Sequence, residues 1–338
     1  MNKTTIPAAR VRQVLDAATK TRVLVIGDAM LDHFVWGRVS RISPEAPVPV
    51  VEFERESFIP GGAANVARNL TALNVPTELF GVVGRDPAAS HLVRLLKDHH
   101  IGCDGLLPFD GRATSVKMRI VAHQQQVVRL DRETRHALDE SAVRRLLAAL
   151  DEKLPGAAAV IVGDYGKGAV TQPLLEEIKT RCRANGVWLS VDPKPVHKLD
   201  LGGLSLITPN RKEAFELAGL PDETRNPDPF ADENLMRVVK QLLAELRPVL
   251  LLVTLGELGM LLCRAGEKLF HIPTQAQEVF DVSGAGDTVI ATFTLAIAGG
   301  ASPLEAAIIS NHAAGIVVGK VGTAVAATEE LLASFRHG

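Results

Sequence analysis

Residues 23–28 read Val-Leu-Val-Ile-Gly-Asp, an apolar run that ends in a glycine and a carboxylate. A continuous apolar run is typical of a strand buried on both faces of a parallel sheet. Comparable runs recur along the chain at residues 79–83, 158–163, 188–192, 204–209 and 249–254. We therefore predict a mostly parallel sheet whose strands are spread over most of the chain.

Helical patterns separate these apolar runs. They lie at residues 63–73, 88–99, 140–153, 172–184, 232–246, 285–297, 303–318 and 329–335. Strands that alternate with helices predict an α/β fold in which helices cover both faces of the sheet. Ligands of such folds bind at the carboxyl ends of the strands, which is where Gly27 and Asp28 would lie.

Two segments, residues 32–59 and 112–131, break this rhythm. The first contains several prolines, and in both segments apolar and polar side chains alternate. Alternation predicts antiparallel strands rather than further strand–helix–strand units. We expect the two segments to come together as one small sheet that is inserted into the main domain.

The length of 338 residues fits either one large α/β domain or two smaller ones. The most linker-like stretch, residues 220–230, contains three prolines but lies between two predicted helices. A surface loop explains this stretch better than a domain boundary does. We expect a single domain, residues 1–338, that carries the inserted sheet.

The composition excludes several classes of protein. Lys and Arg number 37 and Asp and Glu 39, so the formal net charge is −2, which argues against a nucleic-acid binder that neutralises phosphates. No apolar stretch approaches the ~20 residues that span a bilayer, and the N-terminus lacks the apolar core of a signal peptide. We expect a cytoplasmic protein that binds neither nucleic acids nor membranes.

The three cysteines, Cys103, Cys182 and Cys263, are widely separated along the chain. Their spacing fits neither a zinc site nor a disulfide framework. We expect three reduced thiols in the core, which agrees with a cytoplasmic location.

Residues 281–287, Asp-Val-Ser-Gly-Ala-Gly-Asp, precede a long apolar helix and carry most of the functional information. A glycine-rich turn at a helix N-terminus presents unpaired N–H groups, which bind anions together with the helix dipole. Asp287 falls in the first helical turn, where it could accept a hydroxyl proton during phosphoryl transfer to an alcohol. From this stretch alone, simple helix capping by Asp287 is the alternative.

A second glycine pair, in Pro60-Gly-Gly-Ala-Ala-Asn65, also opens a predicted helix. Adjacent glycines let a ligand lie against the backbone, and Asn65 offers both a donor and an acceptor. A plain helix N-terminus is the alternative. The motifs of other enzyme classes, GxxxxGK[ST], HExxH, GxSxG and a GxGxxG after the first strand, do not occur.

Four motifs, in order along nearly the whole chain, resemble those of the ribokinase/PfkB family of carbohydrate kinases. They are PGGAANVARNL (60–70), NRKE (210–213), TLGELG (254–259) and DVSGAGDTVIATF (281–293). The resemblance implies a ribokinase-like three-layer α/β/α fold in which the two inserted segments form a β-sheet lid over the sugar. It also implies ATP and Mg²⁺, a K⁺ loop, and a homodimer formed through the lid.

The resemblance assigns roles residue by residue. Asp287 would be the general base, and its N–H would complete an anion hole made by Gly284, Ala285 and Gly286. The residues that would hold the sugar hydroxyls are Asp28, Gly61, Gly62 and Asn65. Those that would surround the nucleotide are Lys194, Asn210, Thr254, Gly256, Gly259 and Asn311. Those that would organise cations are Asn210 and Glu213 for Mg²⁺, through water, and Asp281, Ser283 and Gly322 for the monovalent ion.

Residues 27–51, 125–131, 191–195 and 273–290 resemble one branch of this family, the heptose 7-phosphate kinases. The branch implies transfer from ATP to the anomeric hydroxyl of D-glycero-β-D-manno-heptose 7-phosphate. The product would be the 1,7-bisphosphate, on the route to ADP-heptose for lipopolysaccharide core. Some members carry a second, nucleotidyltransferase half. Because residues 319–324 match the end of the kinase part, we expect a stand-alone kinase.

A sugar that already carries a phosphate needs a cationic site. The candidates in the two inserted segments are Arg38, Arg41, Lys117, Arg119 and Arg129. Arginine suits the role because its guanidinium binds phosphate in a bidentate manner, although we expect about half of the five to be solvated bystanders. Two other functions stay open: another PfkB-type sugar or sugar-phosphate kinase, and a catalytically silent, nucleotide-responsive binding protein.

Overall fold

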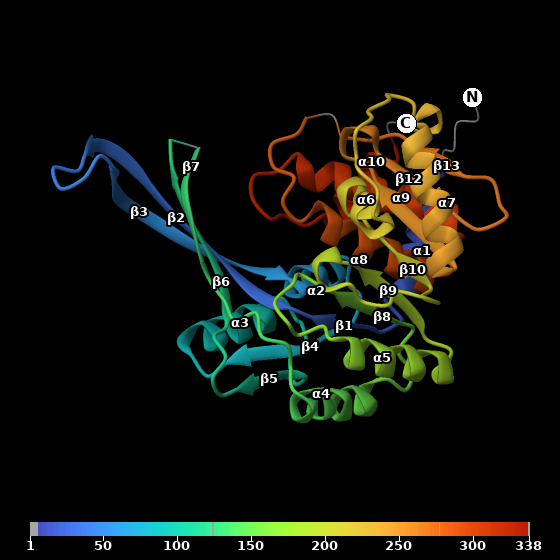
Figure 1. The fold of residues 1–338 in the computed structure, drawn as a ribbon, viewed down its shortest axis with the longest axis horizontal. Helices are drawn as coiled ribbons and strands as arrows, with labels where there is room; N and C mark the ends of the chain where they lie inside the picture. Colours follow the sequence, from blue (N-terminus) through green and yellow to red (C-terminus); the bar gives the residue numbers. More distant parts are fainter. Residues whose placement is uncertain (1–5, 124, 277, 337–338) are drawn as a thin grey trace.

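A nine-stranded sheet forms the centre of the protein (Figure 1), in the order β13-β12-β11-β10-β9-β8-β1-β4-β5. The computed structural model describes residues 6–123, 125–276 and 278–336; the other positions of the predicted span 1–338 lie outside the described residues. The strands are β1 (Val23–Gly27), β4 (Thr77–Gly84), β5 (Leu106–Phe109), β8 (Ala159–Gly163), β9 (Trp188–Asp192), β10 (Leu206–Ile207), β11 (Leu250–Thr254), β12 (Met260–Cys263) and β13 (Phe270–Ile272).

The first seven strands of this set, from β1 to β11, pair in parallel. Strands β12 and β13 add an antiparallel extension at one edge. The prediction of a mostly parallel sheet is therefore confirmed. The short strands β5, β12 and β13 were not predicted, because runs of three or four residues give too little periodicity to stand out.

Helices cover both faces of the sheet. They are α1 (Ala8–Ala18), α2 (Ala63–Ala72), α3 (Pro87–Asp98), α4 (Glu140–Lys153), α5 (Gln172–Asn185), α6 (Arg211–Ala218), α7 (Glu233–Leu246), α8 (Ala285–Ala298), α9 (Pro303–Val318) and α10 (Thr328–Ser334). Short 3₁₀ turns lie at Pro195–His197, Pro229–Ala231 and Gly256–Leu258. Within the described ranges, no helix is both long and apolar enough to cross a membrane.

The all-apolar sequence of β1 follows from its burial on both faces. Val23 and Val25 belong to one hydrophobic core, which α1, α2, α3, α8, α9 and α10 complete. Leu24 and Ile26 belong to a second core on the opposite face, which α4, α5, α6 and α7 complete. Because successive strand side chains point to opposite faces, β1 contributes to both cores, and the predicted three-layer α/β/α fold is confirmed.

The two inserted segments form a separate four-stranded sheet, the lid, in the order β3-β2-β6-β7. Its strands are β2 (Ala29–Ile42), β3 (Pro49–Gly62), β6 (Ser115–Ala122) and β7 (Gln125–Arg132). Each segment is an antiparallel hairpin, as predicted, but β2 pairs with β6 in parallel. The parallel pair corrects the prediction, and it arises because β2 and β6 follow β1 and β5, which both run in the same direction.

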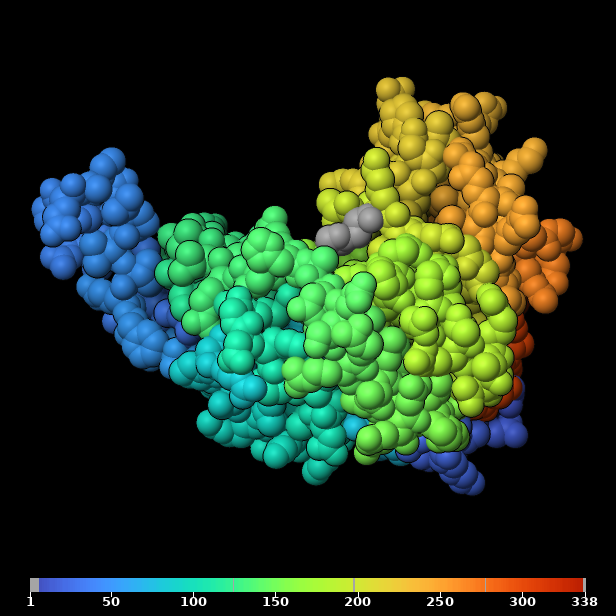
Figure 2. Space-filling model, turned by 60° about the horizontal axis from the view of Figure 1, so that its bottom comes forward, coloured from blue at the N-terminus to red at the C-terminus, as the bar shows by residue number. Residues whose placement is uncertain are grey.

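The lid stands away from the three-layer core. Figure 1 shows β2 and β3 running outward together, and Figure 2 shows the tip of their hairpin projecting as an arm. The lid carries large apolar side chains that face solvent, among them Phe53 at 64% and Leu130 at 62% exposure. Such a concentration is unusual away from an interaction surface.

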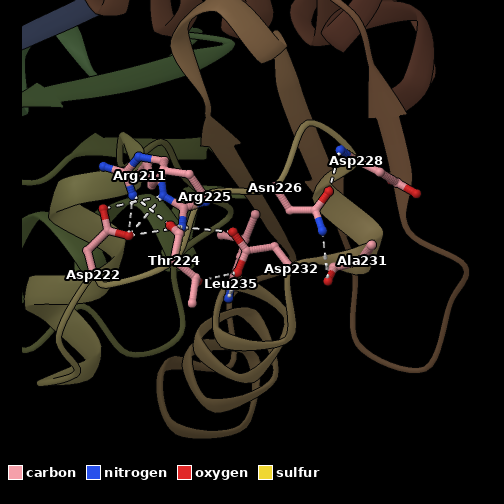
Figure 3. A network of polar contacts seen from close by, with 9 residues as sticks. All are labelled: Arg211, Asp222, Thr224, Arg225, Asn226, Asp228, Ala231, Asp232 and Leu235. Carbon is pink, nitrogen blue, oxygen red and sulfur yellow. Dashed lines mark hydrogen bonds and ion pairs between the residues drawn. The ribbon is translucent and has the colours of Figure 1, made fainter.

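The proline-rich stretch 220–230 is a loop between α6 and α7, fastened to the start of α6 (Figure 3). Arg211 donates to Asp222 at 2.9 Å and to Asp232 at 2.9 Å. The pKa of Asp232 is lowered overall. Burial alone would raise it, but the hydrogen bonds from the Leu235 N–H and the Thr224 hydroxyl and the contact with Arg211 outweigh that effect, so the carboxylate stays ionised. These contacts are local, as expected of a loop within a domain.

Candidate active site

Asp287 lies in the first turn of α8, at the carboxyl ends of the central strands, and is 9% exposed. Its Oδ2 accepts a hydrogen bond from Nδ2 of Asn65 at 2.7 Å, and its Oδ1 accepts one from the Tyr165 hydroxyl at 2.6 Å. The two predicted signature helices, α2 and α8, therefore meet through this carboxylate.

The environment of Asp287 raises its pKa to about 6. Burial is the main cause, and the neighbouring Asp32 raises the pKa as well. The hydrogen bonds from Asn65 and Tyr165 act in the opposite direction, as does the charge of Lys117. A carboxylate whose pKa lies near neutrality is suited to accept a proton and later release it.

The turn before α8, where the anion hole is predicted, contains a glycine in the left-handed region. Gly284 adopts a φ of 81°, and a Cβ at this position would lie 2.8 Å from Nδ2 of Asn65, so only glycine fits. A Cβ at Gly286 would meet nothing within 4 Å, which leaves this side of the turn open to a ligand. The N–H of Ala285 differs from expectation, because it donates to the carbonyl of Val282 at 3.2 Å.

The carboxylate of Asp28 accepts hydrogen bonds from the backbone of the loop that follows β8. It is 3% exposed, and its oxygens accept backbone N–H bonds from Tyr165 at 3.0 Å, Lys167 at 3.0 Å and Ala169 at 2.9 Å. This carboxylate anchors the loop that follows β8. The sugar-binding role expected of Asp28 stays a prediction, and the contacts that the structure shows for this carboxylate are all with the backbone.

Asp32, which the sequence patterns did not single out, lies where Asp28 was expected to act. Its Oδ1 accepts from Nη1 of Arg119 at 2.6 Å, and a Cβ added to Gly61 would lie 2.5 Å from its Oδ2. Lys117 is directly opposite Asp32 in the β2–β6 register. The signal available in the sequence was a carboxylate within an apolar stretch, four residues after Asp28.

The five basic lid candidates separate into two groups. Lys117 and Arg119 lie beside Asp32. The pKa of Lys117 is lowered, mainly by burial and also by the positive charges of Lys167 and Arg119, whereas the negative charge of Asp32 acts to raise it. The other three form no ion pair with Asp32. Arg38 forms an ion pair with Glu54, Arg129 forms one with Asp131, and Arg41 is exposed. Arg38 is six residues beyond Asp32 on β2, or about 20 Å along the strand.

The predicted magnesium residues are engaged with one another and with Lys194. Asn210 caps α6 by accepting from the Glu213 N–H at 3.0 Å, and Oε2 of Glu213 accepts from the Asn210 N–H at 3.0 Å. Oε1 of Glu213 accepts from Nζ of Lys194 at 2.9 Å. Both oxygens of Glu213 thus have partners, and the described ranges contain no group of three potential metal-ligating side chains.

The carboxylate of Asp192, at the end of β9, interacts electrostatically with Glu213 of this cluster and with Asp287. Burial raises its pKa well above the usual value, and the charges of Glu213 and Asp287 raise it further. The hydroxyl of Thr208, which donates to Oδ1 at 3.2 Å, and the charge of Lys194 act against this. A ligand that brought positive charge to this place would relieve the repulsion among the three carboxylates.

The predicted nucleotide residues on β11 and α9 fall into two kinds. Thr254 ends β11 and bridges to Asn210, and Gly256 has a φ of 61° with open space around it. Gly259 and Asn311 are instead packed against the strand end at residues 272–274: a Cβ at Gly259 would lie 2.1 Å from the Ile272 carbonyl, and Asn311 donates to the Pro273 carbonyl at 2.6 Å. A nucleotide-binding role for Gly259 and Asn311 stays a prediction.

The predicted monovalent-cation residues lie in loops that touch each other. The N–H of Ser283 donates to Oδ1 of Asp281 at 2.8 Å, and the N–H of Asp281 donates to the Val318 carbonyl at 3.2 Å. Gly322 adopts a φ of 75° in the following turn. The structure thus places the two loops together.

The fold and this arrangement define a class of protein: an α/β enzyme with a carboxyl group whose pKa is raised to about 6 beside a glycine-rich helix N-terminus, an arrangement suited to phosphoryl transfer. Residues 20–330 match the model of the pfkB family of carbohydrate kinases. The chain therefore belongs to the PfkB family and is a carbohydrate kinase, and the resemblance inferred from the four motifs is confirmed.

Two curated relatives that match the chain carry the same name. The chain is 44% identical over 317 residues to the Bifunctional protein HldE of Paramagnetospirillum magneticum, a match to 94% of this chain and 64% of the relative. It is 40% identical over 328 residues to the Bifunctional protein HldE of Citrifermentans bemidjiense, a match to 97% of this chain and 66% of the relative. The chain thus spans about two thirds of the length of these relatives.

Solved structures confirm the ribokinase-like fold. The phosphofructokinase-2 of Escherichia coli in complex with substrates and products superposes with a TM-score of 0.76 at 20% identity, covering 94% of this chain and 99% of that one. The Arabidopsis thaliana ribokinase complexed with ribose and ATP gives a TM-score of 0.72 at 20% identity, with the same coverage.

Proposed function

We propose that the protein transfers the γ-phosphoryl group of ATP to the anomeric hydroxyl of D-glycero-β-D-manno-heptose 7-phosphate. Membership of the PfkB family and the relatives named HldE support a kinase of this branch. The observation that carries the sugar-phosphate part is the group Asp32, Lys117 and Arg119, which combines a hydroxyl acceptor with two cations on neighbouring lid strands. The proposal concerns the kinase reaction alone, on the route to lipopolysaccharide core.

Asp287 would act as the general base in this reaction. Its carboxylate accepts the proton of the attacking hydroxyl, while the N–H groups at the start of α8 stabilise the negative charge on the transferring phosphoryl group. Asn65 holds the base in place and also offers a free acceptor, because no hydrogen-bond partner of its buried Oδ1 occurs in the described part of the chain. A sugar hydroxyl that donates to this oxygen would satisfy it.

The substrate phosphate would bind to Lys117 and Arg119. Arg119 neutralises Asp32 in the structure described here, and it retains further guanidinium N–H groups for a phosphate. Asp32 and Gly61, which lie against each other, would border the sugar. The whole lid would exclude water, which otherwise competes with the sugar for the phosphoryl group.

The nucleotide would lie over Thr254 and Gly256, with Lys194 meeting its phosphates. Asn210 and Glu213 would hold Mg²⁺ through water, since both Glu213 oxygens already have protein partners. Bound Mg²⁺ neutralises phosphate charge, and its strong hydration suits such indirect contacts. The loops at Asp281 and Gly322 would take K⁺, an ion named for the Escherichia coli phosphofructokinase-2 in complex with potassium.

The exposed apolar side chains of the lid support a homodimer formed through this sheet. Phe53 on β3 and Leu130 on β7 are the most accessible of them. Light scattering tests this directly: the wild type should have twice the monomer mass, and Phe53→Asp with Leu130→Asp should give the monomer. An unchanged mass for the double variant would exclude the lid as the interface.

A substrate panel separates the heptose phosphate from its rivals. The kcat/KM values of ATP-dependent phosphorylation would be compared for heptose 7-phosphate, fructose 6-phosphate, ribose and adenosine. The proposal requires heptose 7-phosphate to be preferred by at least about 100-fold, the discrimination that a hydrogen-bonded phosphate site provides. Preference for another sugar would establish a different PfkB-type kinase. Sugar-phosphate binding without ADP release from ATP would indicate a silent binding protein.

A further inference from the structure

Tyr165 is the only tyrosine in the sequence, and its hydroxyl donates to Oδ1 of Asp287 at 2.6 Å. None of the four family motifs contains it. It follows β8, at the same edge of the sheet as Asp28. From this contact we propose that Tyr165 is a positioning residue for the base: it fixes the plane of the Asp287 carboxylate and favours its ionised form. The proposal rests on the assignment of Asp287 as the base.

The backbone around Tyr165 is held unusually firmly for a loop. Its N–H donates to Oδ2 of Asp28, and the N–H groups of Lys167 and Ala169 donate to the same carboxylate. The tyrosine ring lies against Gly163, where a Cβ would come within 2.9 Å of Cε2. The phenol is therefore directed at Asp287 by the main chain and by close packing, and Asp28 acts on the base through this loop.

Tyr165 serves as a donor in this contact while Asp287 is ionised. Burial and the charges of Asp287 and Asp192 raise its pKa well above the usual value, so the phenol keeps its proton. A phenol that donates to a carboxylate stabilises the ionised form. Asn65 donates to the other oxygen, so both oxygens are oriented, and each keeps a second lone pair for the sugar hydroxyl.

Other charged groups also act on Asp287, and they must be separated from the effect of Tyr165. Asp32 and Lys117 approach from the lid, with opposite effects on its pKa. Two further charged groups interact with Asp287, namely Arg68 of α2 and Asp192 of β9. The guanidinium of Arg68 also donates to the Thr323 carbonyl. None of these groups is altered when the Tyr165 hydroxyl alone is removed.

The first experiment uses the single tyrosine as a probe. Protein grown with 3-fluorotyrosine should give one ¹⁹F resonance, whose shift follows the ionisation of Asp287 with a midpoint near pH 6. The same resonance should not titrate in this range in Asp287→Asn. A resonance that is independent of pH between 4.5 and 8 in the wild-type protein would overturn the proposal. This readout needs no turnover, so it is separate from the failure of the proposed reaction.

The second experiment measures the pH profile of kcat/KM for Tyr165→Phe. Loss of the donor should move the acidic limb up by about one pH unit, the equivalent of one hydrogen bond to a charged group, with the KM for ATP unchanged. Thr292→Val is the matched control, since it removes a buried hydroxyl of α8 that has no partner within the described residues. An acidic limb that coincides with the wild type in Tyr165→Phe would refute the positioning role.

Discussion

Nδ2 of Asn65 and Oδ2 of Asp287 lie 2.7 Å apart, although the two residues are separated by 222 positions in the sequence. The contact joins the N-terminal turns of α2 and α8, the two helices that carry the glycine-rich signatures. A second link, from the Thr288 hydroxyl to Oδ1 of Asn69 at 2.8 Å, lies one helical turn along α2. Asp287, the proposed base, is thus held by the packing of two helices rather than placed on a loop.

Removal of the proposed base should lower the turnover rate strongly while leaving nucleotide binding intact. Asp287→Asn keeps the size of the side chain and can still contact Asn65, but it cannot accept the hydroxyl proton. We expect kcat to fall by about 10²–10⁴-fold, the usual contribution of a general base. Calorimetric titration with ATP should give a dissociation constant close to that of the wild type. Activity within a few-fold of wild type would show that another group takes the proton.

The raised pKa of Asp287 also has a consequence for stability. Because the folded pKa, about 6, exceeds the ordinary value of a carboxyl group near 4, this group stabilises the fold at low pH. The contribution is lost as the pH rises through about 6. Asp287→Asn should therefore raise the free energy of unfolding by about 1–3 kcal/mol at pH 7.5 and change it little at pH 4. Urea denaturation at the two pH values measures this difference, and equal effects at both would contradict it.

The two lid cations beside Asp32 should determine affinity for the sugar phosphate. We expect Arg119→Gln and Lys117→Gln to raise the KM for the phosphorylated sugar by about 10–100-fold, since each removes a charge-assisted hydrogen bond. The KM for ATP should stay within about two-fold of the wild-type value.

Arg129→Gln provides the control for these two variants. Arg129 lies opposite Arg119 in the lid register but is exposed and paired with Asp131. It should leave both KM values unchanged. If Arg129→Gln raised the KM for the sugar phosphate as much as Arg119→Gln does, the phosphate site would have to include β7.

Asp28 should behave as an anchor and not as a sugar ligand. Asp28→Asn removes the charge that three backbone N–H groups share, and we expect the free energy of unfolding to fall by about 2–4 kcal/mol. In the protein that still folds, kcat should fall because Tyr165 and Asp287 lose their alignment, whereas the KM for the sugar should change little. A large rise in this KM at unchanged stability would restore the role expected from the sequence.

Much of the fold could be predicted from residues 23–28 and the runs that resemble them, because burial on both faces leaves a continuous apolar pattern. The parallel pairing of β2 with β6 could not be predicted. Alternating apolar and polar side chains indicate a half-exposed strand but do not indicate the direction of the neighbouring strand. That direction is set by where each hairpin leaves the main sheet.

The candidate site shows the same division. Asp287, Gly284 and Asn65 belong to local motifs whose residue types already suggest their chemistry. Tyr165 and Asp32 were not predicted, because each reaches the site through contacts between distant segments, to Asp287 and to Arg119 respectively. Two carboxylates four residues apart, Asp28 and Asp32, cannot be told apart by residue type. Only the fold determines which one binds the backbone and which one faces the lid.

The position of the transferred phosphate tests the central claim most directly. The protein would be incubated with ATP, Mg²⁺ and D-glycero-β-D-manno-heptose 7-phosphate, and the product analysed by ³¹P–¹H correlation NMR. We predict a second phosphate ester coupled to the anomeric proton, one ADP formed per sugar, and an initial rate of product formation lower by about 10²–10⁴-fold with Asp287→Asn. A phosphate on any other carbon, or no phosphorylation of this sugar by an enzyme that phosphorylates another, would contradict the proposed function.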